Sequence, residues 1–199
     1  MNKLIFASNN QHKVDEMRSI LGGFEIMSLK EAGIDIDIPE PFNTLEENAS
    51  EKSSVIYRLT KTNCFSEDTG LEVNALHGEP GVKSARYAGN LRSSQDNIEL
   101  LLLNLEHEQD RSAQFRTILS LLIDGTEFLF EGICKGTILA YIRGNGGFGY
   151  DPVFVPDGSS KTFAEMEMSE KNLFSHRKKA MEKMLSFLNN DKFLSTNRL

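Results

Sequence analysis

The stretch from residue 113 to residue 140, AQFRTILSLLIDGTEFLFEGICKGTILA, decides the class of fold. Apolar and polar residues alternate from Ala113 to Ile123, which is the pattern of a half-buried strand. Asp124-Gly125 is a favoured turn sequence, and residues 127–140 then return as the partner strand. Because helical segments flank this long hairpin, the sequence predicts an α/β (mixed α+β) fold with a mixed β-sheet.

Four helices are predicted outside the hairpin from apolar residues at helical spacing. The first carries Val14, Met17, Ile20 and Leu21 and ends at Gly22-Gly23. The second opens with the capping-box pattern of residues 44–47 and runs to about residue 61. Ser94 is expected to cap the third, and the last is expected to start at Ser169 with Leu173 and Leu188 on one apolar face.

Shorter segments predict further strands and one loop. Residues 3–7 are typical of a buried strand, and residues 64–66 and 71–75 predict two short strands on either side of an acidic turn, Glu67-Asp68-Thr69-Gly70. Four glycines between residues 144 and 149 predict a loop. No repeat or linker divides the 199 residues, so we expect a single domain over residues 1–199, with a polar and disordered tail at 190–199.

Composition narrows the classes of function. The chain has 22 Lys and Arg against 29 Asp and Glu, a net charge of −7, which argues against nucleic-acid binding. A small anionic ligand remains possible where a few lysines and a divalent cation converge. The apolar runs are too short to span a membrane, and the two cysteines lie too far apart in sequence for a zinc motif. We therefore expect a cytoplasmic protein with no membrane partner.

Two polar clusters in the first half of the chain are candidates for chemistry. Residues 8–13, SNNQHK, lie between a strand and a helix, where backbone N–H groups receive phosphate; the alternative is a simple helix cap with a solvated Lys13. Glu67 and Asp68, with Glu40 and Glu47 upstream, would suit a hard cation; the alternative is an acidic surface turn.

Two more clusters lie in the second half. In residues 146–152, GGFGYDP, the glycines allow a ligand close to the backbone, and two aromatic rings offer faces for stacking a base. Lys171, with residues 175–177, SHR, would reach phosphate and a purine edge, or else form a solvated helix face.

Taken in order along the chain, these clusters resemble the Ham1/RdgB family of inosine/xanthosine triphosphate pyrophosphatases. The matching stretches are residues 8–13, residues 44–49 with Lys52, residues 66–71, residues 81–89 with Ser84-Ala85-Arg86-Tyr87, residues 146–152, and Lys171 with residues 175–177. The resemblance implies an elongated mixed sheet with flanking helices and two lobes around a central substrate cleft. It also implies a Mg²⁺-dependent enzyme, usually a homodimer, that hydrolyses ITP, dITP and XTP at the α-phosphorus to a monophosphate and pyrophosphate.

The resemblance assigns roles residue by residue. Asp68 matches the aspartate that binds metal and accepts a proton, and Glu40 is the candidate for the second metal carboxylate, with Glu47 or Glu67 as alternatives. Ser8, Asn10 and Lys13 are expected to hold the triphosphate, and Lys52 and Lys171 to add charge to it. Further substrate contacts are expected from Asn9, Gln11, His12 and Thr69. The expected contacts with the base are Arg86, Phe148, Gly149, Tyr150, Asp151, His176 and Arg177.

Two rival functions stay open on sequence alone. One is a Maf-like pyrophosphatase for modified pyrimidine nucleotides, against which Arg86 and the His176-Arg177 pair argue. The other is a nucleotide-binding sensor without hydrolysis, which the carboxylates Asp68, Glu40 and Glu47 disfavour.

Overall fold

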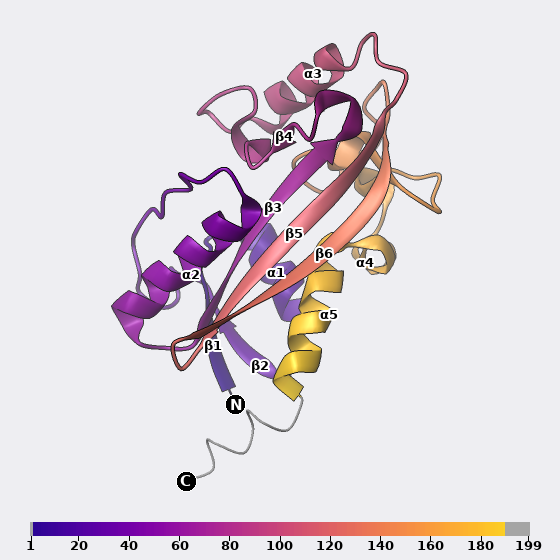
Figure 1. The fold of residues 1–199 in the computed structure, drawn as a ribbon. Helices are drawn as coiled ribbons and strands as arrows, with labels where there is room; N and C mark the ends of the chain where they lie inside the picture. The colour runs from indigo at the N-terminus through magenta and orange to yellow at the C-terminus, as the bar shows by residue number, and fades with distance from the viewer. Residues whose placement is uncertain (1, 190–199) are drawn as a thin grey trace. The chain divides into compact units, whose positions relative to one another are not determined.

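The computed structural model describes residues 2–189, so the expectation for the tail at 190–199 falls outside the described residues. The elements in chain order are β1 (Asn2–Phe6), α1 (Gln11–Ile20), β2 (Phe24–Met27), α2 (Leu45–Thr60), β3 (Cys64–Val73), β4 (Pro80–Gly81), α3 (Ser94–Asn104), β5 (Ser112–Ile123), β6 (Thr126–Ile138), β7 (Phe154–Pro156), α4 (Met168–Phe174) and α5 (His176–Asn189) (Figure 1). The prediction of a mixed α/β fold is confirmed.

Seven strands form one mixed sheet in the order β2-β1-β3-β5-β6-β7, with β4 paired to β3. β1 runs parallel to both β2 and β3, whereas β3 pairs antiparallel with β4, and β6 pairs antiparallel with β7. The predicted hairpin is present: β5 and β6 are joined through Asp124 and Gly125, both of which have positive φ, as such a turn requires. Among the described residues, no helix is long and apolar enough to cross a membrane.

The chain divides into two compact units. The first contains the residues up to Asp68, Thr117–Gly132, and the residues from Arg177 onward; the second contains Thr69–Arg116 and Ile133–His176. Each has apolar clusters of its own.

In the first unit, helices cover both faces of the sheet. Side chains alternate between the faces of a strand, so Phe6 and Phe65 lie on one face, where their rings stack 4.7 Å apart. This face packs against Val14 of α1 and Ala180 of α5. The opposite face packs against Ile56 of α2. Side chains of neighbouring residues in β3 therefore point to opposite faces of the sheet, one toward α1 and α5 and the other toward α2.

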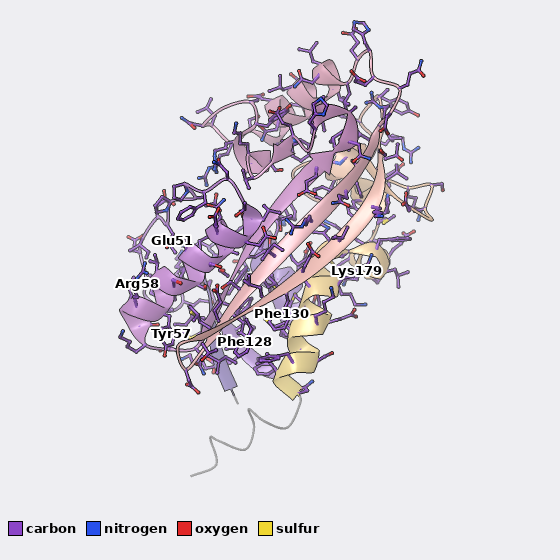
Figure 2. The ribbon with its side chains drawn as sticks, viewed as in Figure 1. Glu51, Tyr57, Arg58, Phe128, Phe130 and Lys179 are labelled. Carbon is purple, nitrogen blue, oxygen red and sulfur yellow. The ribbon has the colours of Figure 1, made fainter. Side chains whose placement is uncertain are left out.

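Near the turn of the β5–β6 hairpin, aromatic side chains of β6 pack against α5. Phe128 and Phe130 of β6, labelled in Figure 2, lie with their ring centroids 4.4 and 5.5 Å from that of Phe187 of α5. Figure 2 also shows Glu51 and Arg58 on α2, whose side chains form an ion pair with a 3.3 Å N–O distance. The aromatic contacts attach α5 to the sheet, whereas the Glu51–Arg58 pair lies on the surface of α2.

The second unit packs around an aromatic cluster. Phe115 of β5 contacts Phe154 and Phe163, with ring centroids 4.7 and 6.0 Å apart. Leu101 of α3 is buried in the same cluster. Polar residues of this unit, among them His176 and Lys171, pack against these rings.

The acidic segment of β3 corrects the sequence prediction. Residues 67–70 were expected to form a turn between two short strands, but residues 64–73 form one continuous strand. Glu67 and Asp68 remain in the strand because each finds a cationic partner on its own side of the sheet. Gly70 is not a turn residue either: a Cβ placed there would lie 2.7 Å from the Gly81 carbonyl oxygen, so glycine lets β4 approach.

The predicted C-terminal helix is also corrected. It is two helices, α4 and α5, separated by Ser175, whose φ of −50° and ψ of 122° interrupt the helical path. Leu173, expected on the apolar face, is 72% exposed. At the third helix the cap is Ser93 rather than Ser94, because the Ser93 hydroxyl accepts a hydrogen bond from the Asp96 backbone N–H.

Candidate active site

The loop between β1 and α1 is fixed by its own side chains. The Ser8 hydroxyl accepts a hydrogen bond from the Asn10 N–H at 3.1 Å, and the Asn10 side chain caps α1 by accepting from the Lys13 N–H at 3.3 Å. The Asn9 side chain accepts from the Lys30 N–H at 2.8 Å, which ties the loop to the segment after β2. This arrangement places the positive end of the α1 dipole at residues 10–13.

The remaining polar residues of this loop differ in their surroundings. Gln11 donates to Asp15 within α1 at 2.6 Å, and both Gln11 and His12 are exposed on the helix. Lys13 turns toward β3, where its ammonium lies 3.0 Å from Glu67. Lys13 therefore places a positive charge next to Glu67, close to the N-terminus of α1.

Glu67 lies in a buried network of charges. Arg177 of α5 donates through Nε and one terminal nitrogen to both carboxylate oxygens of Glu67, at 2.6 and 2.9 Å, and through its other terminal nitrogen to Glu16 of α1. Burial alone would raise the pKa of Glu67, but the charges of Arg177 and Lys13 hold it well below its usual value. Glu67 is therefore a carboxylate whose ionised form is favoured by the two cations beside it.

Asp68 lies on the other face of β3 and has a different environment. The Lys52 ammonium of α2 lies 3.4 Å from Asp68 and 2.6 Å from Glu40. Burial raises the pKa of Asp68; the Lys52 charge lowers it and the Glu40 charge raises it, and the net direction is upward. An aspartate whose protonated form is favoured in this way has the property expected of a group that accepts a proton during catalysis.

Two polar residues at the start of α2, Glu47 and Asn48, have different surroundings. Glu47 is exposed and accepts a hydrogen bond from the Thr44 hydroxyl at 2.8 Å, so it belongs to the capping of the helix. Asn48 is fully buried and both donates to and accepts from the backbone of Phe42, which fixes the loop that leads into α2. Thus the structure brings Glu40, not Glu47, to the ammonium that Asp68 shares.

The second unit brings together Phe148, Asp151 and Lys171. Asp151 accepts from the Phe148 N–H at 2.9 Å and forms a buried ion pair of 2.7 Å with Lys171. The Lys171 ammonium also lies 5.1 Å from the Phe148 ring centroid and 5.3 Å from that of Phe163, within the range of cation–π attraction. A charged pair therefore lies beside a half-exposed aromatic ring.

The other predicted substrate contacts of this unit occupy several positions. His176 is buried, and its ring stacks on Phe115 with 4.8 Å between centroids. Tyr150 is buried in the apolar cluster, and its hydroxyl donates to the Ser84 carbonyl at 2.9 Å. Arg86 is half-buried at the end of a short 3-10 turn, Thr69 is half-buried in β3, and Gly149 lies in the loop with φ of 59°.

Arg177 is buried in ion pairs. Its guanidinium donates to the carboxylates of Glu67 and Glu16, with 1% of the residue exposed. Its predicted role beside the base, with His176, stays a prediction. Sequence reasoning missed Glu16 and Asn48. Glu16 could have been found, because a charge on the apolar stripe of α1 between Val14 and Met17 needs a buried partner.

Comparisons with known proteins show the family to which the chain is similar. Residues 4–187 match the model of the Ham1 family. A protein from Porphyromonas gingivalis named dITP/XTP pyrophosphatase is 47% identical over 190 residues, which cover 94% of this chain and 98% of that protein. One of the same name from Flavobacterium johnsoniae is 45% identical over 187 residues, covering 94% and 97%.

Solved structures of Ham1 proteins are also similar to this chain. The Ham1 protein of Staphylococcus aureus has a TM-score of 0.88 and 38% identity, covering 96% of this chain and all of that one. A HAM1 protein from Coxiella burnetii has a TM-score of 0.87 and 34% identity, covering 94% and 98%. This chain therefore belongs to the Ham1 family.

Proposed function

We propose that this chain hydrolyses the non-canonical purine nucleoside triphosphates ITP, dITP and XTP at the α-phosphorus. The products are a nucleoside monophosphate and pyrophosphate, and the role is removal of deaminated purines from the nucleotide pool. The names of the relatives support this reaction. The observation that carries it is Asp68, a buried carboxylate with a raised pKa, beside the ammonium of Lys52.

Lys13 and Lys52 would hold the triphosphate in this reaction. Each is a lysine on a helix that packs against β3, and each has a carboxylate partner there, Glu67 or Asp68. An ammonium has three donors, so either lysine keeps its partner while it donates to phosphate oxygens. The N–H groups at the start of α1 add a fixed positive potential for the same anion.

The residues around Lys52 also fit a magnesium ion. Within residues 2–189, no group of three or more His, Cys, Asp or Glu is close enough to form a metal cage. Glu40 and Asp68 share one ammonium and offer two oxygen donors, which suits Mg²⁺ because it is commonly held by one or two carboxylates with substrate phosphates and water. When bound, the ion would neutralise charge on the triphosphate and on the departing pyrophosphate.

Asp68 would receive the proton of the attacking water. The water oxygen bonds to the α-phosphorus, the bond from that phosphorus to the bridging oxygen breaks, and pyrophosphate leaves with the electron pair. Asp68 either takes the proton or orients the water, and its raised pKa suits the first role. Lys52 would remain beside it and stabilise the ionised carboxylate between turnovers.

The residues of the second unit would recognise the base. Phe148 offers an aromatic face, and the donor His176 stacks on Phe115 and lies beside Phe163. Lys171, next to Phe148, would keep its predicted role of adding charge for the triphosphate. Hypoxanthine and xanthine carry a carbonyl at position 6, where adenine carries an amino group. A buried donor facing position 6 would reject adenine by a factor of up to about 10⁴, because the donor would be left unpaired.

Two further features belong to this proposal. We expect a homodimer, as the resemblance implies, and analytical ultracentrifugation of the purified chain tests that expectation. We also expect the enzyme in the cytoplasm, where nucleotide precursors are used; Cys64 and Cys134 are buried thiols, which fits a reducing compartment.

Product analysis tests the function. The enzyme is incubated with ITP, dITP, XTP, GTP, ATP and dUTP, with and without Mg²⁺, and products are separated by ion-exchange chromatography. We expect Mg²⁺-dependent formation of IMP and pyrophosphate from ITP, with ATP and GTP poor substrates. An Asp68→Asn preparation purified in parallel controls for contaminating hydrolases.

The other outcomes would each replace the proposal with a different function. IDP and orthophosphate would move the attack to the γ-phosphorus. Preference for dUTP or a modified pyrimidine would favour the Maf-like reaction. Tight binding of nucleotides without multiple turnovers would favour a sensor.

A further inference from the structure

Four buried or half-buried charges connect α5 to the N-terminus of α1. They are Arg177, Glu67, Glu16 and Lys13, and they form a chain of contacts in which Arg177 binds both carboxylates and Glu67 binds Lys13. We propose that Arg177 is a positioning residue for the triphosphate: with Glu16 it fixes Glu67, and Glu67 in turn holds the Lys13 ammonium at the anion site. This inference rests on the proposed function, because it assigns Lys13 to the triphosphate.

The first step is the geometry of Arg177. Each of its three nitrogens donates to a carboxylate, two to Glu67 and one to Glu16. Two parallel N–H···O bonds fix the plane of the Glu67 carboxylate as well as its position. A lysine has one ammonium and lacks this planar fork, so it could not hold the carboxylate in the same plane. Orientation, beyond charge alone, is therefore what Arg177 contributes.

The second step is access to solvent. The side chains of Arg177, Glu67 and Glu16 are 2%, 0% and 4% exposed, whereas that of Lys13 is 22% exposed. Among these four charged groups, Lys13 is the one an anion from solution can reach. The other three are buried, so their contact with such an anion would pass through Lys13.

The third step is competition for the Lys13 ammonium. Glu67 is a buried anion that needs compensation, and the Arg177 fork supplies most of it. If the fork is lost, Glu67 depends on Lys13 as its counter-ion and draws the ammonium away from solution. The phosphate oxygens would then compete with a buried carboxylate, and the triphosphate would bind more weakly whatever base it carries.

Two variants that conserve charge test this chain of contacts. Arg177→Lys removes the fork, and Glu16→Asp shortens the carboxylate that orients Arg177. The probe is inorganic tripolyphosphate, which has no base, and its dissociation constant is measured by calorimetry. We expect about fivefold to tenfold weaker binding for both variants. Glu31→Asp is the matched control, because Glu31 also pairs with an arginine, Arg18, but in an exposed position without contact to Lys13; its binding is expected to be unchanged.

A double-mutant cycle shows whether the effect passes through Lys13. In a Lys13→Met background, Arg177→Lys and Glu16→Asp are expected to have no further effect on tripolyphosphate binding. In steady-state kinetics, the KM values for ITP and GTP are expected to rise by the same factor. A general loss of folded protein would lower the apparent kcat and leave these constants unchanged, so it would not imitate the result. If Arg177→Lys does not fold, Glu16→Asp alone decides.

Three outcomes would overturn the inference. One is unchanged tripolyphosphate binding together with an altered ratio of ITP to GTP turnover, which would return Arg177 to the base. The second is that Arg177→Lys and Glu16→Asp weaken tripolyphosphate binding in the Lys13→Met background by as much as they do in the wild type. The third is absence of tripolyphosphate binding by the wild-type chain. The same preparation is assayed for release of IMP and pyrophosphate from ITP: absence of that reaction refutes the proposed function, whereas its presence with unchanged tripolyphosphate binding refutes only this inference.

Discussion

Glu67 and Asp68 are neighbours on β3, yet they lie in opposite electrostatic surroundings. Glu67 faces α1 and α5, where Arg177 and Lys13 hold its pKa well below the usual value. Asp68 faces α2, where burial dominates over the single ammonium of Lys52 and raises its pKa. The alternation of side chains along a strand separates the two by one layer of sheet. One carboxylate is thereby fixed as a charge, and the other is left able to change its protonation state.

The comparison indicates a division of work between two similar residues. A carboxylate bound by several cations is a poor base, because protonation would break its ion pairs. A carboxylate with a raised pKa accepts a proton more readily at neutral pH. We therefore assign chemistry to Asp68 and organisation to Glu67, and substitutions at each position should have different effects.

The largest expected effect is on turnover in Asp68→Asn. Removal of the proton acceptor should lower kcat for ITP by about 10²- to 10⁴-fold. The folded state should be retained, and its free energy of unfolding should not fall, because the native environment disfavours the charge of Asp68. Circular dichroism and urea unfolding are the controls. A variant with a near-normal kcat would remove Asp68 from the catalytic assignment.

The opposite behaviour is expected of Glu67→Gln. This substitution leaves Arg177 buried with fewer negative charges around it, so we expect a loss of about 3 kcal/mol in the free energy of unfolding. Urea titration measures it, and Glu31→Gln, which affects an exposed Arg–Glu pair, should show a much smaller loss. Equal losses for the two variants would contradict the view of Glu67 as a buried structural charge.

Glu40 and Glu47 allow a finer test on the Asp68 side. Glu40 shares the Lys52 ammonium with Asp68, whereas Glu47 is exposed and hydrogen-bonds to Thr44 in the cap of α2. Glu40→Gln should raise the Mg²⁺ concentration for half-maximal activity by about tenfold or more, because a metal donor is lost. Glu47→Gln should change it by less than about twofold. The reverse order would transfer the metal role to Glu47.

The sequence predicted those parts of the fold whose periodicity is strong. The β5–β6 hairpin and α2 with its Thr44 cap have the expected limits within a few residues, because alternation and capping are local signals. β3 was divided wrongly because Glu67-Asp68-Thr69-Gly70 has the composition of a turn. The partners that keep it extended, Arg177 and Lys52, lie 110 and 16 residues away in sequence.

The candidate site was predictable only in part, because some of its contacts join residues that are far apart in sequence. The clusters around Ser8–Lys13 and Phe148–Asp151 could be recognised from their composition, and their roles as substrate contacts stay predictions. The role of Arg177 depends on Glu16, which has no signature apart from a charge on an apolar helix face. Ser175 separates α4 from α5 by its backbone conformation, which the helix-compatible sequence around it does not indicate.

The smallest expected effect concerns the exposed pair that serves as a control above. Glu31 accepts hydrogen bonds from Arg18 and from the backbone and hydroxyl of Ser28, and these contacts lower its pKa to about 2. Since the pKa is depressed in the folded state, the stabilisation is present above the unfolded value of 4.5 and is lost as the pH falls toward about 2. The difference in free energy of unfolding between the wild type and Glu31→Gln should therefore shrink over that interval, which urea titrations at several pH values and constant ionic strength would measure. A difference independent of pH would mean that Glu31 stabilises the loop by hydrogen bonding alone. The exposed pair Arg18–Glu31 and the buried pair Arg177–Glu67 would then differ more than their shared Arg–Glu chemistry suggests.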